Sequence, residues 1–586
     1  MQKKILGLNS GGPNTAAVLL VDGKIVYAVE EERLTREKQT RRFPSNAIKA
    51  ILEFSSMELE DLDAVAINWN PAVNLEAPNV PQNQRARYMG EIYSQIPYHL
   101  MSLKSDNLSS RSQQTLHFLD NSKIDIHYIE HHMSHASCFF SSPFESAAVL
   151  TTDAFGEKQS ITFSEGKGSQ LDLIWSQEFP HSLGSFYSVF TEYLGFVPSS
   201  EEWKLMGASS YGDAEKFYKK LLQTVKLQDK GGFELDLTYF NHFQFYRPGM
   251  FTSKLAQLLG IEPREEGAAL TQEHYDLAAS AQKVFEDIYF HLLASLHQMT
   301  GQENVVISGG AALNCVANGM VLEKTSFADV FVPPVPDDSG GAMGAAYYLY
   351  NHIMGEKRGP AMSSNYLGPG FSNEEVVEFL NKSGIQFTQI DDSSKTAAKL
   401  IANGKIIGWF QGRLEYGDRA LGNRSILADP RDPDMKSKVN ATIKYREDFR
   451  PFAPSILLEK IDEYFENAVP TPYMEKASRI RAEKHKLIPA VTHVDGTGRL
   501  QTVSQDQNCL YWSLIDEFRK ITGIPIVLNT SFNLRGEPIV CTPKDAYLCF
   551  MRTEMDCLII GNYLLYKTEQ KPLVGDSDWQ SEFELD

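Results

Sequence analysis

The sequence predicts an α/β protein with two domains, on three observations. The chain has 586 residues, and 42% of them are hydrophobic, so each of two or more domains has enough apolar side chains for a core. Apolar segments that end in glycine-rich turns recur through the first half. A stretch rich in Gly, Pro and Ser then follows at residues 355–369. We expect these parts: a first domain at 1–355, a linker at 356–372, a second domain at 373–575 and an acidic tail at 576–586.

The first strands of the predicted fold lie within the first thirty residues. Residues 5–9 and 16–21 are apolar, and residues 24–29 alternate between apolar and polar. Turn residues separate them, first Ser10–Asn14 and then Asp22–Gly23. A glycine-rich turn between two buried strands leaves backbone N–H groups to face an anion. An ordinary hairpin is the alternative reading of this segment.

Two further strands carry polar or glycine-rich ends. Residues 147–152 are followed by Asp153, and residues 305–308 run into Gly309–Asn314 and a helical pattern. A strand, a Gly–Gly pair and a helix together suit the approach of a phosphate or nucleoside, because the helix N-terminus favours negative charge. The three glycine elements occur in the order of the two phosphate loops and the adenosine loop of the actin, Hsp70 and sugar-kinase superfamily. That superfamily is built from ribonuclease-H-like halves.

A candidate metal site begins in the segment Glu130–His135. On a helix, His131 and His135 lie four residues apart on one face and can bind one ion, while His132 is a rival ligand through its spacing to His135. Further ligands must come from elsewhere, and we expect Asp153 and Asp338. Two imidazoles with carboxylates suit Fe(II), Zn or Mn. Two alternatives stay open: a His-rich helix end without metal, and Asp337 or Asp338 as a helix cap.

The predicted second domain has strands at residues 405–409, 453–458 and 524–528, with basic residues in the loops between them. Residues 412–425 alone hold three arginines and three glycines. Arginine donates in a planar fork to phosphate and carboxylate, and Asn or Ser fixes the orientation of such ligands. We interpret these loops as an anion pocket; a solvated basic surface is the alternative.

The overall charge limits the classes of partner. The chain holds 56 Lys and Arg against 75 Asp and Glu, a formal net charge of −19. Without a concentrated basic face, such a chain is repelled by nucleic acid and by anionic membranes, so we expect neither as a partner. No C-x-x-C pair, signal peptide or long apolar run is present, and we expect a cytoplasmic protein.

Long segments of the sequence carry a resemblance to a known family. In the second half these are GRLEYGDRALGNRSILADPR (412–431), FRPFAPS (449–455) and NTSFNLRGEPIVCTPKDA (529–546). In the first half these are AVEEERLTREK (28–38), EHHMSHA (130–136), EEWKLMGASSYG (201–212), GGAALN (309–314) and DDSGGAMGAA (337–346). From about residue 4 to residue 562, the chain resembles the O-carbamoyltransferases of the NodU/CmcH family. The resemblance implies an ASKHA-type (ribonuclease-H-like, Kae1/actin-like) first domain and a YrdC-like α/β second domain.

The resemblance also implies a two-step reaction. The second domain would combine carbamoyl phosphate with ATP, accompanied by Mg, to give carbamoyl-AMP and pyrophosphate. The first domain would pass the carbamoyl group to a hydroxyl of a small natural-product acceptor. The implied metal is Fe(II) or another divalent cation, bound by His131, His135 and Asp338, with Asp153 as a fourth ligand or a phosphate-loop carboxylate. The implied catalytic residues are His131, His135, Asp338, Lys444 and Arg499. The implied binding residues for cofactor and substrate are Gly309, Gly310, Asn314, Lys204, Arg419, Arg424, Lys444, Arg450, Arg499, Asn529, Ser531 and Asn533.

The chain departs from the family pattern at two places. Pro13–Asn14 stands where the family usually has a His–Asp pair, which leaves the base that activates the acceptor unassigned. Asp418 stands where Pro or Ala is commoner. The metal-ligand candidates are not affected.

Three other functions share some of these features: a threonylcarbamoyl-type tRNA-modifying transferase, an ASKHA-type ATPase or kinase, and a regulatory homologue without catalysis. The acidic charge argues against the first, and the His pair and arginine-rich loops argue against the second.

We expect acceptor contacts from residues 70–121, for example Tyr88, Tyr93 and Tyr98, and from residues 239–251. These aromatics suit a core or a homodimer surface equally. The acidic chain favours a cationic acceptor, such as an aminoglycoside or guanidinium alkaloid.

Overall fold

The computed structural model describes residues 2–10, 12–70, 111–244, 248–444 and 450–573. The chain forms two compact units, one of residues 1–31 and 41–362 and the other of residues 32–40 and 363–586. The division at Met362 falls inside the stretch that the sequence marks as a linker. Segment Glu32–Thr40, however, groups with the second unit, whereas a division by sequence alone gives residues 1–355 to the first. Tyr88, Tyr93, Tyr98 and the acidic tail lie outside the described residues.

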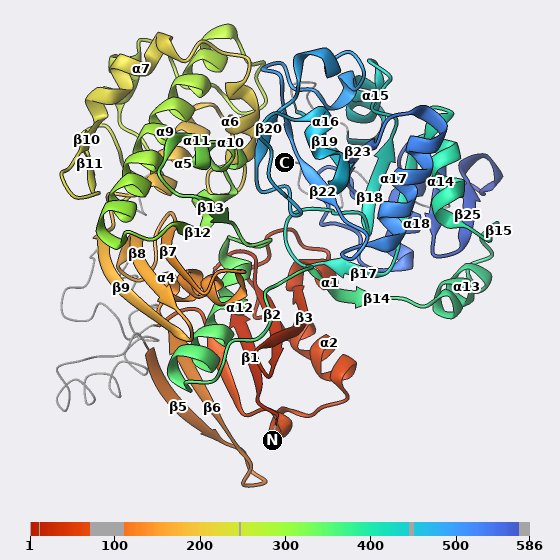
Figure 1. The fold of residues 1–586 in the computed structure, drawn as a ribbon, viewed down its shortest axis with the longest axis horizontal. Helices are drawn as coiled ribbons and strands as arrows, with labels where there is room; N and C mark the ends of the chain where they lie inside the picture. Colours follow the sequence, from red (N-terminus) through yellow and green to blue (C-terminus); the bar gives the residue numbers. More distant parts are fainter. Residues whose placement is uncertain (1, 11, 71–110, 245–247, 445–449, 574–586) are drawn as a thin grey trace. The chain divides into compact units, whose positions relative to one another are not determined.

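The first sheet of unit 1 has six strands in the order β3-β2-β1-β4-β6-β5 (Figure 1). Their bounds are β1 (Lys4–Asn9), β2 (Ala16–Val21), β3 (Lys24–Glu30), β4 (Ala64–Ile67), β5 (Arg111–His117) and β6 (Lys123–Ile129). Strands β1, β2 and β3 are antiparallel neighbours, while β4 runs parallel to both β1 and β6. The first thirty residues therefore form the three predicted strands.

The second sheet of unit 1 has five strands, in the order β13-β12-β7-β8-β9, and repeats the arrangement of β3, β2, β1, β4 and β6; β5, which pairs antiparallel with β6, has no counterpart in it. Its strands are β7 (Ser146–Thr152), β8 (Gln159–Lys167), β9 (Gln170–Glu178), β12 (Asn304–Ser308) and β13 (Asp329–Phe331). Again three consecutive antiparallel strands are followed by two that add in parallel on the side of the first. Two sheets with this order and these directions make the ribonuclease-H-like, ASKHA-type architecture that the glycine loops predict.

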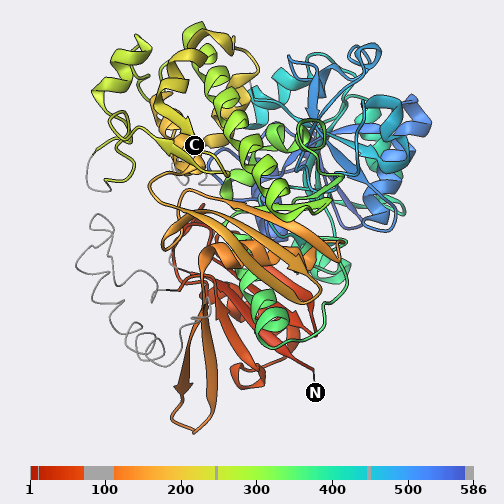
Figure 2. The ribbon, with the colours of Figure 1, turned by 60° about the vertical axis from the view of Figure 1, so that its left-hand side comes forward.

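Two helices connect the sheets. Helix α12 (Asp338–Tyr347) packs against β1, β2 and β4 of the first sheet, and α4 (His131–Ala136) packs against β7, β8 and β12 of the second. The two helices also contact each other, and both are visible between the sheets in Figure 2. These elements pack so closely that only glycine fits at two of the contacts. A Cβ on Gly7 of β1 would lie 2.1 Å from the Ala342 carbonyl oxygen of α12, and one on Gly344 of α12 would lie 1.8 Å from the Ser134 carbonyl oxygen of α4.

The rest of unit 1 is mainly helical: α5, α6 and α7 pack on α9 (Gln272–Thr300), whereas α2 packs on β2 and β3 of the first sheet. The other elements are α2 (Ser45–Ser55), α5 (Leu183–Tyr193), α6 (Glu202–Ser209), α7 (Glu215–Leu221), α8 (Ser253–Leu259), α10 (Cys315–Gly319), α11 (Val321–Lys324) and the hairpin β10 (Val225–Leu227) and β11 (Phe233–Leu235). Helix α1 (Glu31–Thr35) begins in unit 1 and continues into the segment that groups with unit 2.

Unit 2 is an α/β domain built on an eight-stranded mixed sheet in the order β15-β25-β24-β16-β18-β23-β19-β22. The strands are β15 (Thr388–Gln389), β16 (Ile407–Phe410), β18 (Arg424–Ala428), β19 (Ala453–Leu457), β22 (Gln501–Val503), β23 (Ile526–Ser531), β24 (Cys557–Ile560) and β25 (Tyr563–Tyr566). The three strands predicted from sequence are thus present as β16, β19 and β23. Two further pairs join β14 (Tyr366–Gly370) with β17 (Arg413–Glu415) and β20 (Ala477–Arg479) with β21 (Thr497–Arg499).

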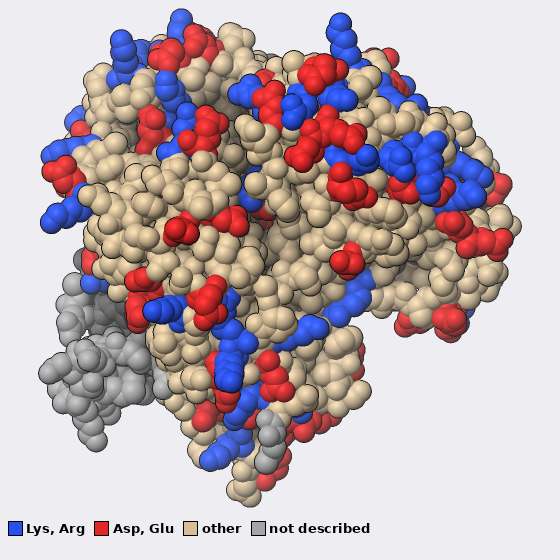
Figure 3. All heavy atoms as spheres, viewed as in Figure 1, with Lys and Arg blue, Asp and Glu red and all other residues tan. Residues whose placement is uncertain are grey.

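The helices of unit 2 are α13 (Asn373–Lys382), α14 (Ser393–Ala402), α15 (Met435–Val439), α16 (Ile461–Tyr464), α17 (Cys509–Thr522) and α18 (Pro543–Met551). Trp409, Phe518 and Leu528 are fully buried in its core. Within the described residues, no helix combines the length and the apolar character that crossing a membrane requires. On the face drawn in Figure 3, acidic and basic side chains are interspersed.

Candidate functional site

Two histidine side chains on α4 face each other in the interior of unit 1. His131 and His135 are 3% and 0% exposed, and their Nε2 atoms are 3.1 Å apart. The four-residue spacing on one helical turn produces this approach, as the sequence predicts. The helix starts where the Glu157 carboxylate accepts hydrogen bonds from the His131 backbone N–H, at 3.0 and 3.1 Å.

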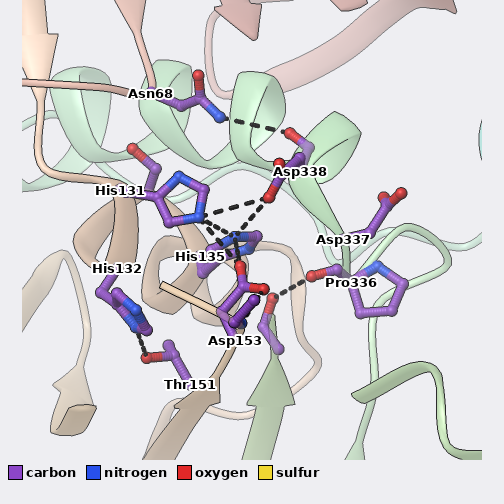
Figure 4. Close-up of polar contacts among 12 residues, drawn as sticks. Asn68, His131, His132, His135, Thr151, Asp153, Pro336, Asp337 and Asp338 are labelled. Carbon is purple, nitrogen blue, oxygen red and sulfur yellow. Dashed lines mark hydrogen bonds and ion pairs between the residues drawn. The ribbon is translucent and has the colours of Figure 1, made fainter. Parts of the chain in front are cut away.

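Two carboxylates complete the cluster (Figure 4). Asp153 directly follows β7, and its Oδ2 lies 3.0 Å from Nε2 of His131 and 3.1 Å from Nε2 of His135. Asp338 opens α12, and its Oδ1 lies 3.4 and 3.6 Å from the same two nitrogens. One donor atom from each of the four residues lies within 4.8 Å of every other. The structure thus brings together the four residues that the sequence puts forward as ligands.

The spacing of these donor atoms fits a single metal ion. Two ligands at about 2.1 Å from a cation are about 3.0 Å apart at right angles and about 3.4 Å apart at a tetrahedral angle. The distances of 3.0 to 3.6 Å from the histidine nitrogens to the carboxylate oxygens match the edges of such a shell. Two nitrogens and two carboxylate oxygens are a donor set for a first-row divalent cation, Fe(II) among them.

The electrostatics of the cluster agree with a site for positive charge. Burial lowers the pKa of His135, but the hydrogen bonds and charges of Asp153 and Asp338 outweigh it and raise that pKa to about 10. Burial raises the pKa of Asp153, yet His131 and His135 hold it well below its usual value. Two anionic oxygens therefore favour either protonated imidazoles or a cation shared by the four side chains.

The other two candidates from this region lie outside the cluster. His132 turns its Nδ1 to the Thr151 hydroxyl oxygen, 2.7 Å away, and so is not a rival ligand in this geometry. Asp337 precedes α12 but makes no side-chain cap to it; its Oδ2 accepts a hydrogen bond of 2.9 Å from the Asn14 amide. Asn14 thus links the first glycine-rich turn to the start of the helix that carries Asp338.

Four neighbouring residues were not found by sequence reasoning. Three of them follow β4: Asn68 donates to the Asp338 carbonyl oxygen at 3.4 Å, the Trp69 ring lies 5.5 Å from that of His131, and the Asn70 N–H donates to Glu157 at 2.6 Å. Glu157 is the fourth, and it binds His131 as described. Polar residues at the end of an apolar strand are a usable signal, whereas Glu157 lies in a loop that carries none.

The glycines predicted to approach a nucleotide lie beside the metal cluster. Gly309 has φ +93°, and a Cβ there would lie 2.2 Å from the Thr152 carbonyl oxygen. A Cβ on Gly310 would lie 3.0 Å from Oδ1 of Asp153. Asn314 instead caps α10 by accepting from the Ala317 N–H at 3.1 Å. Lys204 forms a buried ion pair with Glu201. Nucleotide binding by these four residues stays a prediction.

In unit 2, three predicted ligands form one polar cluster. The Lys444 ammonium is buried and donates to Ser531 through the carbonyl oxygen, at 2.6 Å, and the hydroxyl, at 3.2 Å. It also donates to the carbonyl oxygen of Asn533, at 3.0 Å, and to its Oδ1, at 2.6 Å. Ser531 ends β23, so this strand carries the group to the lysine.

The remaining candidates of unit 2 differ in exposure. Arg450 and Asn529 are buried, whereas Arg419 and Arg499 are partly exposed. The Asn529 amide donates to the Ala420 carbonyl oxygen at 3.1 Å and to Oε1 of Gln501 at 2.9 Å. It therefore fixes the residue after Arg419. The ligand roles of these four residues stay predictions.

Arg424 has a geometry that favours a structural role over ligand binding. Its side chain is fully buried, and its guanidinium carbon lies 3.7 Å from the centre of the Phe410 ring. The guanidinium donates to the backbone carbonyl oxygens of Gln411, Gly412, Asn423 and Pro369. Burial lowers the pKa of Arg424 to about 10, with Glu415 opposing that effect.

Both parts of the chain are similar to known protein families. Residues 4–347 match the family described as Carbamoyltransferase N-terminus, and residues 398–567 match Carbamoyltransferase C-terminus. Nodulation protein NolNO of Sinorhizobium fredii (strain NBRC 101917 / NGR234) is 38% identical, over 97% of this chain and 81% of that protein. Nodulation protein NolO of Bradyrhizobium diazoefficiens is 40% identical, over 75% of this chain and 79% of that protein.

The chain is also similar to a cyanobacterial protein and, in part, to a solved structure. Uncharacterized protein sll1178 of Synechocystis sp. is 40% identical, over 99% of this chain and 100% of that protein. Among solved structures, T. kodakarensis HypF superposes with a TM-score of 0.30 at 13% identity, over 61% of this chain and 48% of HypF. Since that score is low, the fold assignment rests on the strand order and directions given above.

Proposed function

Because the chain belongs to the carbamoyltransferase family, we propose that it is an O-carbamoyltransferase that works through a carbamoyl-adenylate. Unit 2 would activate carbamoyl phosphate with ATP, and unit 1 would transfer the carbamoyl group to a hydroxyl of a small natural product in secondary metabolism. The observation that carries the transfer site is the convergence of His131, His135, Asp153 and Asp338 within 4.8 Å.

The activation step brings together the phosphate groups of carbamoyl phosphate and ATP, so cationic groups are needed to offset their negative charge. Water cleaves carbamoyl phosphate to carbamate and inorganic phosphate; a carbamate oxygen then attacks the α-phosphorus of ATP, whose bond to the pyrophosphate leaving group breaks. The anionic substrates would meet the Lys444 cluster and the arginines Arg419, Arg450 and Arg499. A guanidinium fork orients phosphate oxygens, and Mg accompanies ATP.

The transfer step joins an alcohol to the activated carbamoyl group. The acceptor oxygen attacks the carbamoyl carbon, the bond from that carbon to the AMP oxygen breaks, and the acceptor proton leaves to solvent. A divalent cation, Fe(II) in our proposal, would when bound polarise the carbamoyl oxygen as a Lewis acid. His131, His135, Asp153 and Asp338 would hold that ion. Gly309 lies beside Thr152 and Gly310 beside Asp153, and in this proposal their backbone would face the AMP portion.

The acceptor in this proposal is a cationic small molecule. The chain carries a formal charge of −19, which attracts aminoglycosides or guanidinium alkaloids and disfavours nucleic acid and anionic membrane. A cytoplasmic location and a homodimer belong to the same proposal. Mass spectrometry on hydroxylated aminoglycosides, guanidinium alkaloids, cephems and macrolactams, with a gain of one carbamoyl group as the signal, would identify the acceptor.

The test of the first half-reaction is the release of pyrophosphate from ATP by the purified full chain. We expect it to require carbamoyl phosphate, with one inorganic phosphate formed for each pyrophosphate. Release of ADP in place of pyrophosphate would indicate an ATPase or kinase. No nucleotide turnover with Fe(II), Mg and carbamoyl phosphate present would refute the proposal.

The two half-reactions should separate by mutation. Lys444→Met should abolish pyrophosphate release while chemically prepared carbamoyl-AMP still carbamoylates the acceptor. Replacement of Arg499 should act in the same direction. His135→Ala should do the reverse, since its side chain lies in unit 1 among the metal-ligand candidates. Equal loss of both half-reactions in each variant would show that the two sites are not independent.

A further inference from the structure

A short segment from the first part of the sequence belongs structurally to unit 2. Residues Glu32–Thr40, which we call the brace, group with Ser363–Asp586. The segment includes most of the EEERLTREK motif, for which the proposed reaction supplies no role. Its contacts fall on two loops of unit 2 that carry predicted ligands of carbamoyl phosphate and ATP.

Arg36 holds the first of these loops. Its guanidinium donates to the carbonyl oxygens of Pro538 and Ile539, both at 2.7 Å, and to Oε1 of Glu537 at 2.9 Å. Glu537 is 4% exposed, so its carboxylate needs a partner in the interior. Oδ1 of Asp545 lies 3.8 Å from Nε of Arg36. One side chain thus binds three consecutive residues of the turn 537–539.

The turn that Arg36 holds is joined directly to the Lys444 cluster. The Asn533 amide donates to the Glu537 carbonyl oxygen at 2.7 Å, while its Oδ1 accepts from the Lys444 ammonium. Oε2 of Glu537 accepts from the Leu534 N–H at 2.9 Å. The orientation of Asn533 is therefore set by Glu537, whose other carboxylate oxygen is bound to Arg36.

Arg33 holds the second loop. It is 3% exposed and donates to the Gly417 carbonyl oxygen at 3.0 Å. Gly417 has φ +119° and stands two residues before Arg419 in the arginine-rich segment. The brace consequently fixes a backbone atom close to Arg419 as well as the turn behind Asn533.

The brace has a defined shape of its own. Glu32 forms an ion pair with Arg33, and its Oε2 accepts from the Gln39 N–H at 2.6 Å. Arg36 and Gln39 have φ of +64° and +52°. This left-handed conformation costs energy for a residue with a side chain, and it persists where surrounding contacts stabilise it. The hydrogen bonds of Glu32, Arg33 and Arg36 supply those contacts.

We propose that Arg33 and Arg36 are positioning residues for carbamoyl-phosphate activation, and that the activating unit is complete only with the brace from the start of the chain. The inference rests on the proposed function for its chemistry, and on the hydrogen bonds above for its geometry. It follows that residues C-terminal to the linker do not contain the whole activating unit.

The test compares Arg36→Met in the full chain with Arg41→Met, an exposed arginine just beyond the brace. Arg36→Met should raise the KM for carbamoyl phosphate about 10- to 100-fold, because a displaced ligand costs binding and orientation. The rate of transfer from prepared carbamoyl-AMP in Arg36→Met should stay within about twofold of the wild type. In the control Arg41→Met, the rates of both half-reactions should stay within the same range. Arg36→Lys keeps the positive charge but loses the two-pronged guanidinium donor, so its KM for carbamoyl phosphate should lie between those of Arg36→Met and the wild type.

Amide hydrogen exchange tests, without any substrate, whether Arg33 and Arg36 hold the two loops of unit 2. Peptides covering residues 531–541 should exchange faster in Arg36→Met than in Arg41→Met, and those of residues 412–424 faster in Arg33→Met. Equal exchange, or a KM in Arg36→Met like that of the control, would overturn the inference. If the wild type released no pyrophosphate, the proposed function would fail, and the exchange comparison would still decide the brace.

Discussion

The Glu157 carboxylate binds the backbone N–H of His131 at 3.0 and 3.1 Å and therefore sits at the start of the helix that carries both histidine ligand candidates. It also accepts from the Asn70 N–H at 2.6 Å. Glu157 is 5% exposed, and burial raises its pKa. A buried carboxylate in this position joins the end of β4 to the end of α4 that bears His131.

Replacing Glu157 should weaken metal binding without removing a ligand. We expect Glu157→Ala to lower the affinity for Fe(II) or Zn about 10- to 100-fold, the usual effect of losing a group that orients ligands. Competition with a chelator of known affinity measures this. Glu178→Gln is the control, since Glu178 is exposed and forms an ion pair with the exposed Lys158. Unchanged metal affinity in Glu157→Ala would show that α4 is held by other contacts.

His135 and His132 offer a matched pair for the metal site itself. Both are fully buried on α4, but only His135 points its Nε2 into the four-ligand cluster. We expect His135→Ala to lose the bound metal, and His132→Asn to keep it, because Asn places an amide where His132 has Nδ1 bound to Thr151. Metal content after dialysis checks both. Loss of metal from His132→Asn alone would reassign the ligand.

Much of this centre was predictable because its rules are local. The four-residue spacing of His131 and His135 fixes their common face, and Asp153 stands at the end of an apolar strand. Asp338 needed a longer step, since its approach depends on α12 packing against α4 through Gly344. Strands β1, β2 and β3 likewise follow from the apolar segments of the first thirty residues and the turns between them. The order of the strands in the two sheets, including the antiparallel addition of β5 to β6, is seen only in the folded chain.

The remainder depends on distances along the chain that no local pattern encodes. Arg36 and Glu537 are 501 residues apart in sequence, so the grouping of the brace with unit 2 has no periodic signal. Arg419 and Arg424 look alike in sequence, yet one is partly exposed and the other is fully buried. Burial of an arginine depends on which carbonyl groups surround it, and only the folded chain shows them.

Arg424 should behave as a structural residue, in contrast to Arg419. Arg424→Ala removes the donor that satisfies four backbone carbonyl groups, and we expect a loss of about 3–5 kcal/mol in the stability of unit 2. Arg419→Ala should leave thermal unfolding unchanged and raise the KM for carbamoyl phosphate. Calorimetry and steady-state kinetics give the two readings. A stable Arg424→Ala protein with a raised KM would restore the ligand role.

The stability of unit 1 should depend on pH through His242. Burial lowers the pKa of His242 to about 4, although donation to the Pro180 carbonyl oxygen opposes it. Unfolded histidine has a pKa of about 6.5, so the unfolded chain binds the extra proton between these values. The stabilisation is complete above pH 6.5 and is lost as the pH falls towards 4. At pH 5 the loss should be about 2 kcal/mol.

The test of this dependence is His242→Gln, whose amide nitrogen can replace Nε2 as the donor but does not titrate. Its unfolding free energy should fall less between pH 7 and pH 5 than that of the wild type. His117→Gln, at an exposed position on β5, is the control and should keep the wild-type slope. The same slope in His242→Gln would mean that the acid sensitivity lies elsewhere.

The Asn14 amide donates a hydrogen bond of 2.9 Å to Oδ2 of Asp337. Exchanging the two residue types tests whether this hydrogen bond holds the first turn to α12. Asn14 has φ +53°, a conformation that Asp also tolerates, so Asn14→Asp changes the charge with little backbone cost. It would place two carboxylates in contact beside Asp338, and we expect unit 1 to lose about 1–3 kcal/mol of stability. The double variant Asn14→Asp with Asp337→Asn reverses donor and acceptor, and should recover most of that loss in thermal unfolding. A double variant no more stable than Asn14→Asp alone would show that this contact does not hold the turn to α12.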